Sequence, residues 1–290
     1  MREGSGPILL CTDLDRTLLP NGAQEESPEA RPRFRDIAAR PEVTLCYVTG
    51  RHRTLINAAI EEYALPAPDY AIGDVGTSIY EISEGHWNKW DAWDHQIAQD
   101  WNGRSRGDLE ALLGGITELK PQEPSKQNDY KLSYYLPIEA NRDSALENAR
   151  LLLKEQGVRA SLIWSIDDAM NVGLLDVLPE RATKLHAIEF LMREKGFAVE
   201  RTVFSGDSGN DLPALTSGLQ AVLVRNARED VRELAIRLSA EAGHRAKLYL
   251  ARGGWMGMNG YYAAGVVEGL AHFIPEALDW MSSGKRFKGT

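Results

Sequence analysis

The 290-residue sequence has few cysteines and no long apolar run. Its two cysteines, Cys11 and Cys46, show no CxxC spacing, which argues against a zinc site and against a disulfide framework. Each lies in a short apolar run, so we expect two small buried side chains. No stretch reaches the roughly 18 apolar residues that a membrane-spanning helix needs. We therefore expect a cytoplasmic protein without a membrane segment.

Positive charge is scarce relative to negative charge. The chain has 33 lysines and arginines against 42 aspartates and glutamates, a formal net charge of -9. Such a surface repels nucleic-acid phosphates and anionic membranes, so we expect neither as a partner. Hydrophobic residues make up 43% and charged residues 26%, close to the averages of globular proteins, so the composition indicates neither a fibrous nor a disordered chain.

Short apolar strands separated by helical stretches occupy both ends of the chain. The strand candidates lie at 7–12, 43–48, 201–205 and 220–224. Strands that alternate with helices predict right-handed crossovers and a parallel sheet. The expected fold class is therefore α/β, with a doubly wound, Rossmann-like core.

The middle of the chain follows another pattern, which predicts an inserted α+β cap domain. We expect helices near 105–114 and 143–156 there, and strands near 131–136, 158–166 and 171–178. The expected organisation is a first part of the core at 1–83, a cap domain at 84–179 and a second part of the core at 180–290. A glycine-rich loop at 252–260 is either a packing element or a mobile flap.

Acidic residues cluster directly after two of the predicted strands. Asp13 and Asp15 lie on the same side of an extended segment, and Asp207 and Asp211 share the turn "GDSGND". Acids this close repel one another unless a cation lies between them, and Mg²⁺ is a hard cation that prefers oxygen ligands. Asp211 alone is equally typical of a helix N-cap, but that interpretation leaves Asp207 unexplained.

Two further segments offer groups that suit an anion. Thr49, Gly50 and Arg51 form a strand-to-helix turn, where a hydroxyl and free backbone amides hold phosphate oxygens. The alternative is an ordinary helix start with a solvated arginine. Lys184 begins a predicted helix, where the helix dipole disfavours a cation. Either an anion lies nearby, or the side chain extends into water.

The order DLDRT, TGR, Lys184 and GDSGND resembles that of haloacid-dehalogenase superfamily phosphatases with a C2B-type cap. The resemblance covers nearly the whole chain and is greatest to the sucrose-phosphate phosphatases. The segments "GDVGTSIY", "LLDVLP" and "VLVRNA" of this chain resemble segments of that family in the same order. One departure is Leu185, which stands where many relatives have a glycine after the lysine.

The resemblance implies a magnesium-dependent phosphoric monoester hydrolase. Asp13 would attack phosphorus and form an aspartyl-phosphate, and Asp15 would serve as general acid and then as general base. Thr49 and Lys184 would neutralise charge on the phosphoryl oxygens. Gly50 and Arg51 would add contacts to the phosphate.

The resemblance also implies a composition for the metal site. Mg²⁺ would be held by the carboxylates of Asp13 and Asp207 and by Asp15 through its backbone carbonyl. Asp211 would complete the metal site. Together with the phosphate-binding Asn210, it would position the water ligands of the metal and Lys184.

Substrate selection is expected to depend on the cap segment "LKPQEPSKQNDYKLSYYL", which resembles its counterpart in sucrose-phosphate phosphatases. The resemblance implies that Gln127, Asn128 and Lys131 bind sugar hydroxyls. The alternative is that Gln127 and Asn128 only form a turn, and that Lys131 points outward from a strand. Gly76 and Thr77 are expected to contact the phosphate or the sugar from the core side.

Three functions remain open. The first is hydrolysis of sucrose 6-phosphate, the last step of sucrose biosynthesis, in functional association with the glycosyltransferase that makes the sugar phosphate. The second is hydrolysis of another phosphorylated glycoside such as mannosylfructose phosphate, which needs only altered cap contacts. The third is a noncatalytic module that binds a sugar phosphate, which the intact acidic residues and Lys184 argue against.

Overall fold

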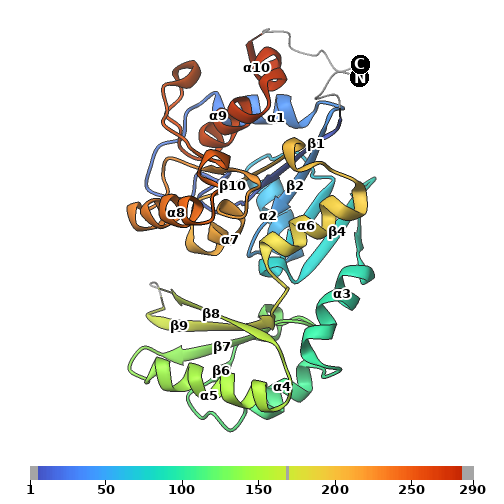
Figure 1. Ribbon diagram of the computed structural model, residues 1–290, viewed down its shortest axis with the longest axis vertical. Coiled ribbons are helices and arrows are strands. Elements are labelled where there is room, and N and C mark those ends of the chain that lie inside the picture. The colour runs from blue at the N-terminus through green and yellow to red at the C-terminus, as the bar shows by residue number, and fades with distance from the viewer. Residues whose placement is uncertain (1–5, 168–169, 283–290) are drawn as a thin grey trace. The chain divides into compact units, whose positions relative to one another are not determined.

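The computed structural model describes residues 6–167 and 170–282, which fall into two compact units. Residues up to Asn88 and from Lys184 onward form the core unit, and Lys89–Thr183 form the insert unit. Both ends of the chain therefore contribute to the core unit (Figure 1). Within the described residues, no helix is long and apolar enough to cross a membrane.

The core unit is built on one sheet, whose eight strands in the described part of the chain run in the order β12-β11-β10-β1-β2-β3-β4-β5. The strands from β12 to β3 are parallel, and β4 is antiparallel to β3. This confirms the predicted α/β class. The strands are β1 (Ile8–Thr12), β2 (Val43–Val48), β3 (Tyr70–Gly73), β4 (Ser78–Ser83), β5 (His86–Lys89), β10 (Thr202–Gly206), β11 (Gln220–Leu223) and β12 (Leu248–Leu250).

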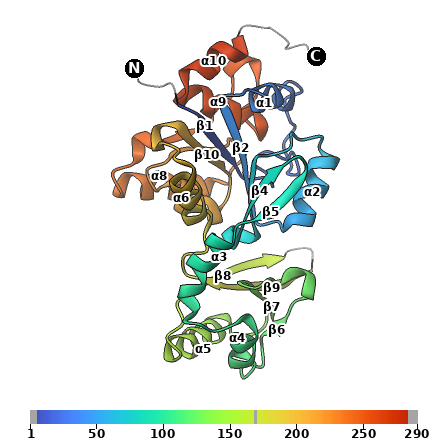
Figure 2. The same cartoon turned by 90° about the vertical axis from the view of Figure 1, so that its right-hand side faces the viewer.

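Helices cover both faces of this sheet, which explains why its central strands are apolar throughout. Buried side chains of α1, α2 and α9 form one apolar cluster with β1 and β2. Helix α6 contacts β3, and α7 contacts β10 and β11; α2 and α6 lie on opposite sides of the sheet (Figure 2). The helices are α1 (Ala30–Ala38), α2 (Arg53–Glu62), α6 (Lys184–Lys195), α7 (Leu212–Leu215), α8 (Glu229–Glu241), α9 (Ala263–Phe273) and α10 (Pro275–Ser282).

The parallel order brings several polar segments to one edge of the sheet. Strands β11, β10, β1 and β2 are neighbours, and their carboxyl ends lead into Arg225, Asp207, Asp13 and Thr49. In doubly wound sheets, ligands bind beyond the carboxyl ends of the strands. This edge is therefore where a site is expected.

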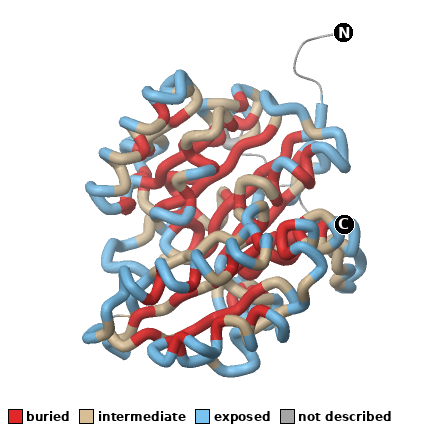
Figure 3. Tube along the Cα trace, turned by 60° about the horizontal axis from the view of Figure 1, so that its bottom comes forward, coloured by how far each residue is buried: buried red, intermediate tan, exposed pale blue. Residues whose placement is uncertain are grey.

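The insert unit has a smaller antiparallel sheet in the order β6-β7-β9-β8. Side chains of α4 and α5 form its apolar core together with one face of the sheet, and buried positions follow the strands of both units (Figure 3). Helix α4 begins with a capping box between Ser105 and Asp108. The elements are α3 (Asp91–Ala98), α4 (Arg106–Leu113), α5 (Arg142–Glu155), β6 (Lys120–Pro121), β7 (Leu132–Pro137), β8 (Ala160–Asp167) and β9 (Val172–Pro179).

Candidate active site

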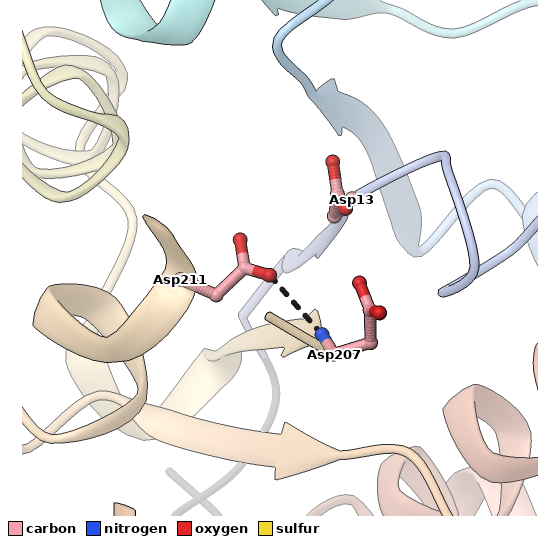
Figure 4. Close-up of side chains that lie close together, drawn as sticks. All are labelled: Asp13, Asp207 and Asp211. Atoms are coloured by element: carbon pink, nitrogen blue, oxygen red, sulfur yellow. Dashed lines mark hydrogen bonds between the residues drawn. The ribbon is translucent and has the colours of Figure 1, made fainter. Parts of the chain in front are cut away.

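Three buried carboxylates meet at the carboxyl edge of the core sheet. Asp13 follows β1, Asp207 follows β10, and Asp211 ends the short 3-10 helix Gly209–Asp211. One oxygen from each lies within 4.8 Å of the others, and Figure 4 shows the three side chains grouped together. Four residues were predicted to bind metal, and the structure brings the side chains of three of them together. The fourth, Asp15, was predicted to bind through its backbone carbonyl.

The turn that carries Asp207 is shaped by Asp211. The Oδ2 atom of Asp211 accepts hydrogen bonds from the backbone N–H groups of Asp207 and Ser208, each at 3.1 Å. A Cβ atom at Gly206 would lie 2.6 Å from the carboxyl carbon of Asp211, so only glycine leaves room for this turn. The first glycine of "GDSGND" therefore has a steric explanation.

Lys184 is buried at the start of α6 and faces two of these acids. Its Nζ atom lies 3.0 Å from Asp13 Oδ1, 2.7 Å from Asp211 Oδ1 and 3.3 Å from Asn210 Oδ1. Burial disfavours the ammonium form, but the charges of Asp13 and Asp211 outweigh burial and raise the pKa of Lys184 above its usual value. These carboxylates are the anions that compensate for a lysine at a helix N-terminus.

The cluster carries more negative than positive charge. Burial, assisted by the charges of Asp211 and Asp207, raises the pKa of Asp13 well above its usual range despite Lys184. Burial and the charge of Asp211 also raise the pKa of Asp207 to about 6. Three carboxylates facing one buried ammonium are therefore a donor set that fits Mg²⁺, which prefers oxygen ligands and would offset the surplus charge.

The carboxylate of Asp15 is bound by Arg51 and Asn21 and is not one of the three grouped acids. Arg51 Nη2 lies 2.6 Å from Oδ1 and its Nε 2.8 Å from Oδ2, while Asn21 Nδ2 donates to Oδ1 at 2.6 Å. Burial alone would raise the pKa of Asp15, but the hydrogen bonds and charge of Arg51, with Asn21, lower it below its usual value. Arg51, which we predicted to contact phosphate, pairs here with the predicted general acid.

The other predicted phosphate-binding residues of the core lie in two linked turns. The carbonyl of the buried Thr49 accepts a hydrogen bond from the N–H of Val75 at 3.2 Å, which joins the turn after β2 to the turn after β3. Gly50 is exposed in the first turn. Gly76 has a φ of 104°, a conformation that favours glycine. Thr77 is buried and its hydroxyl donates to a backbone carbonyl of the same turn.

Two residues of the motif "DLDRT" that received no role from the sequence also contact the acids. Thr17 Oγ1 lies 3.1 Å from Asp207 Oδ1 and 3.5 Å from Asp13 Oδ2. Arg16 Nε lies 3.7 Å from Asp207 Oδ2. Both stand within four residues of Asp13, so their place in the motif was the signal that could have identified them.

In the insert unit, the side chain of Gln127 is fully engaged by its own loop and strand. Its Nε2 donates to the carbonyls of Gln122 and Ser133, at 3.1 and 2.8 Å, and its Oε1 accepts from the N–H of Ser133 at 2.8 Å. These bonds fasten the loop to β7. In this structure Gln127 fixes the loop, which corresponds to the alternative that we left open for it.

Lys131 belongs to a polar cluster on neighbouring strands of the insert sheet. Its Nζ lies 3.7 Å from Asp176 Oδ2, and Ser133 Oγ lies 2.5 Å from Asp176 Oδ1. Asn128 accepts a hydrogen bond from the N–H of Tyr130 at 2.8 Å. The sequence did not single out Asp176, although it lies in the segment "LLDVLP". The structure thus adds an acid beside Lys131.

Comparisons with known proteins agree with this arrangement. The model of the sucrose-6F-phosphate phosphohydrolase family matches residues 6–274. A putative HAD-like hydrolase of Nitrosococcus oceani is 57% identical over 279 residues, 96% of this chain and 75% of that protein. The mannosylfructose-phosphate phosphatase of Agrobacterium fabrum is 29% identical over 270 residues, 91% of this chain and 96% of that protein.

Named sucrose-phosphatases are similar as well. Sucrose-phosphatase 1 of Nicotiana tabacum is 27% identical over 277 residues, and the match covers 92% of this chain but only 59% of the plant protein. The structure of the sucrose-phosphatase from Synechocystis sp., solved with sucrose and phosphate, has a TM-score of 0.71 and 26% identity and covers 92% of this chain and 98% of that chain. The chain therefore belongs to the sucrose-phosphatase family of the haloacid-dehalogenase superfamily.

Proposed function

We propose that this protein is a magnesium-dependent phosphatase that hydrolyses a phosphorylated glycoside, with sucrose 6-phosphate as its substrate. The observation that carries the proposal is the buried cluster of Asp13, Asp207, Asp211 and Lys184 at the carboxyl ends of β1 and β10. Family membership supports phosphoric monoester hydrolysis. We place the reaction in the cytoplasm, after a glycosyltransferase that supplies the sugar phosphate.

In the first half-reaction, a carboxylate oxygen of Asp13 attacks phosphorus and the bond from phosphorus to the sugar oxygen breaks. Asp15 gives a proton to the departing oxygen, so an aspartyl-phosphate and a free sugar are formed. In the second half-reaction, water attacks phosphorus and gives a proton to Asp15, while the bond from phosphorus to the Asp13 oxygen breaks, so inorganic phosphate is released and the Asp13 carboxylate is restored. Arg51 and Asn21 favour the ionised form of Asp15, which is the form that this second step requires.

Charge on the transferred phosphoryl group is neutralised by fixed groups of the core unit. Lys184 is held by Asp13 and Asp211, so its ammonium is oriented before the substrate arrives. Thr49, buried at the end of β2, offers a hydroxyl at the same edge of the sheet. Mg²⁺ bound by Asp13, Asp207 and the backbone carbonyl of Asp15, with Asp211 beside it, would supply further electrostatic stabilisation of the phosphoryl oxygens.

Recognition of the sugar is assigned to the insert unit. Lys131, Asp176 and Ser133 combine an ammonium, a carboxylate and a hydroxyl within one cluster, which suits the donors and acceptors of sugar hydroxyls. A site built on such hydrogen bonds discriminates strongly against ligands that lack them. The second candidate substrate is mannosylfructose phosphate, because the Agrobacterium relative matches 91% of this chain.

Phosphate release tests this function. The purified protein would be supplied with sucrose 6-phosphate, mannosylfructose phosphate, fructose 6-phosphate and glucose 6-phosphate, each with Mg²⁺ and with a chelator. We expect Mg²⁺-dependent release, fastest from sucrose 6-phosphate. A preference for mannosylfructose phosphate would retain the mechanism and change the substrate. Release from none of the esters would reject the enzymatic function and favour a noncatalytic binding module.

A further inference from the structure

The side chain of Asn226 joins two segments that are far apart in the sequence. Asn226 follows β11, and only 5% of its surface is exposed. Its Nδ2 donates to the carbonyl oxygen of Arg16 at 2.5 Å, and its Oδ1 accepts from the N–H of Tyr262 at 2.9 Å. Both ends of this buried amide are therefore used, one of them on the residue directly after Asp15.

The segment that Asn226 holds has an uncommon backbone conformation. Arg16 has a φ of 59°, in the left-handed region that residues other than glycine rarely adopt. Its N–H donates to Asn21 Oδ1 at 2.7 Å, and its Nε lies 3.7 Å from Asp207 Oδ2. A strained residue of this kind persists where its surroundings fix it. Asn226 supplies a buried bond that fixes it.

The glycine-rich loop 252–260 in turn holds the segment that contains Asn226. The backbone N–H of Arg225 donates to the carbonyl of Gly260 at 3.1 Å, and its Nη1 donates to the carbonyl of Asn259 at 2.9 Å. A Cβ atom at Gly260 would lie 2.6 Å from the nitrogen of Gly253, so the loop closes on itself only with glycine there. These contacts favour the packing role over the mobile flap.

We propose that Asn226 is a positioning residue for the turn at Asp15 and Arg16, and that the glycine-rich loop keeps Asn226 in place. Asn226 lies in the segment "VLVRNA", to which the sequence assigned no chemical role. Asn226 is connected to the active site by its hydrogen bond to the carbonyl of Arg16. A shift of the backbone at Arg16 moves both the neighbouring backbone carbonyl of Asp15 and the Arg16 guanidinium beside Asp207. This inference rests on the proposed phosphatase function.

The test compares Asn226→Ala and Asn226→Asp with a matched control, Gln220→Ala. Gln220 is also a buried amide that joins two segments, because its Nε2 donates to the carbonyl of Glu200 at 2.8 Å, and this bond involves neither the turn at Asp15 nor the glycine-rich loop. With p-nitrophenyl phosphate, assayed well below the melting temperature of each variant, we expect kcat to fall about 10- to 100-fold for Asn226→Ala with little change in KM. Gln220→Ala should keep the kcat of the wild type.

Asn226→Asp removes the donor to Arg16 but keeps the size of the side chain. It retains an acceptor for the N–H of Tyr262 and places a carboxylate oxygen against the carbonyl of Arg16, so kcat should stay low, and its melting temperature should fall because a buried carboxylate is added. Wild-type kcat in both Asn226 variants would overturn the proposal, as would an equal loss of kcat in Gln220→Ala. If Asn226→Ala fails to fold, Asn226→Asp alone decides between these outcomes.

Amide hydrogen exchange tests the same proposal without turnover. We expect the peptide that covers residues 13–19 to exchange faster in Asn226→Asp than in the wild type, and at the wild-type rate in Gln220→Ala. Unchanged exchange in Asn226→Asp would overturn the positioning role. Failure of the wild type to release phosphate would reject the proposed function, while the exchange result would still decide whether Asn226 fixes the turn.

Discussion

Buried charges are balanced in opposite ways in the two units. In the core unit, Asp13, Asp207 and Asp211 face a single buried ammonium, that of Lys184. In the insert unit, the fully buried Asp100 is paired with the guanidinium groups of two arginines, Arg159 at 2.5 Å and Arg181 at 2.9 Å.

The difference distinguishes a reaction site from a structural ion pair. The carboxylate of Asp100 is compensated within the unit, and the backbone N–H of Arg181 adds a further bond to it at 2.8 Å. The core cluster has surplus negative charge and needs a cation for full compensation. Carboxyl groups with shifted pKa values concentrate at functional sites. The surplus negative charge therefore indicates that the functional site lies at the carboxyl edge of the core sheet.

The largest expected effect is the loss of the nucleophile. Asp13→Asn should lower kcat on the order of 10⁴- to 10⁶-fold with every ester, because no other group takes over the attack on phosphorus. Phosphate release and circular dichroism would be measured together. The control is Asp36→Asn, an exposed acid on α1, which should retain activity. Substantial turnover by a folded Asp13→Asn protein would contradict the assignment.

Stability should respond in opposite directions to the two kinds of buried acid. Asp100→Asn should lower the free energy of unfolding by about 3 kcal/mol, because two charge-assisted contacts are lost. Asp13→Asn should raise it by about 1 kcal/mol in metal-free protein near neutral pH, because the folded state no longer has to hold a carboxyl group whose charged form burial disfavours. Urea unfolding with a chelator measures both. A loss of stability in both variants would remove the distinction between the two regions.

Lys131→Ala should impair substrate selection and leave the phosphoryl chemistry intact. We expect kcat/KM for sucrose 6-phosphate to fall about 10- to 100-fold, because the ammonium no longer binds a hydroxyl, with little change for p-nitrophenyl phosphate. Lys126→Ala, an exposed lysine of the same loop, is the control. Equal losses with both esters would assign Lys131 a structural role through its pairing with Asp176.

The pH dependence of stability offers a smaller and independent effect. The pKa of Asp207 is about 6 in the folded state, above its ordinary value of 3.8, so the folded state holds this proton to higher pH than the unfolded state. Stability of the metal-free protein should therefore fall as pH rises through this window, by on the order of 2 kcal/mol. The difference in unfolding free energy between wild type and Asp207→Asn isolates this contribution; no pH dependence of that difference would refute it.

The parts that were predictable from sequence are those with local signals. Strand β2 was expected at 43–48 and is observed at Val43–Val48, because an apolar run flanked by helices has few alternatives. The convergence of Asp13 and Asp207 followed from the rule that parallel strands bring their carboxyl ends together, whereas the place of Lys184 beside them was implied only by the family resemblance. Of the core strands, β3, β4, β5 and β12 were missed. Strands β3, β5 and β12 are only three or four residues long and carry no clear periodicity.

The remaining contacts depend on tertiary placement. Arg51 and Asp15 are 36 residues apart, and Asn226 and Arg16 are 210 residues apart. No sequence pattern predicts either pair, because each contact depends on which loops meet at the edge of the folded sheet. In the insert unit, Lys131 and Asp176 meet because β7 pairs with β9, an order that the strand pattern did not specify.

The most direct test of the account is to find the phosphoryl group on the protein. Wild-type protein would be mixed with sucrose 6-phosphate carrying a labelled phosphoryl group, quenched with acid during turnover, and digested. We predict label on the peptide that contains Asp13, and none in Asp13→Asn. Label on another residue, or no labelled protein while phosphate is being released, would contradict a mechanism that passes through an aspartyl-phosphate at Asp13.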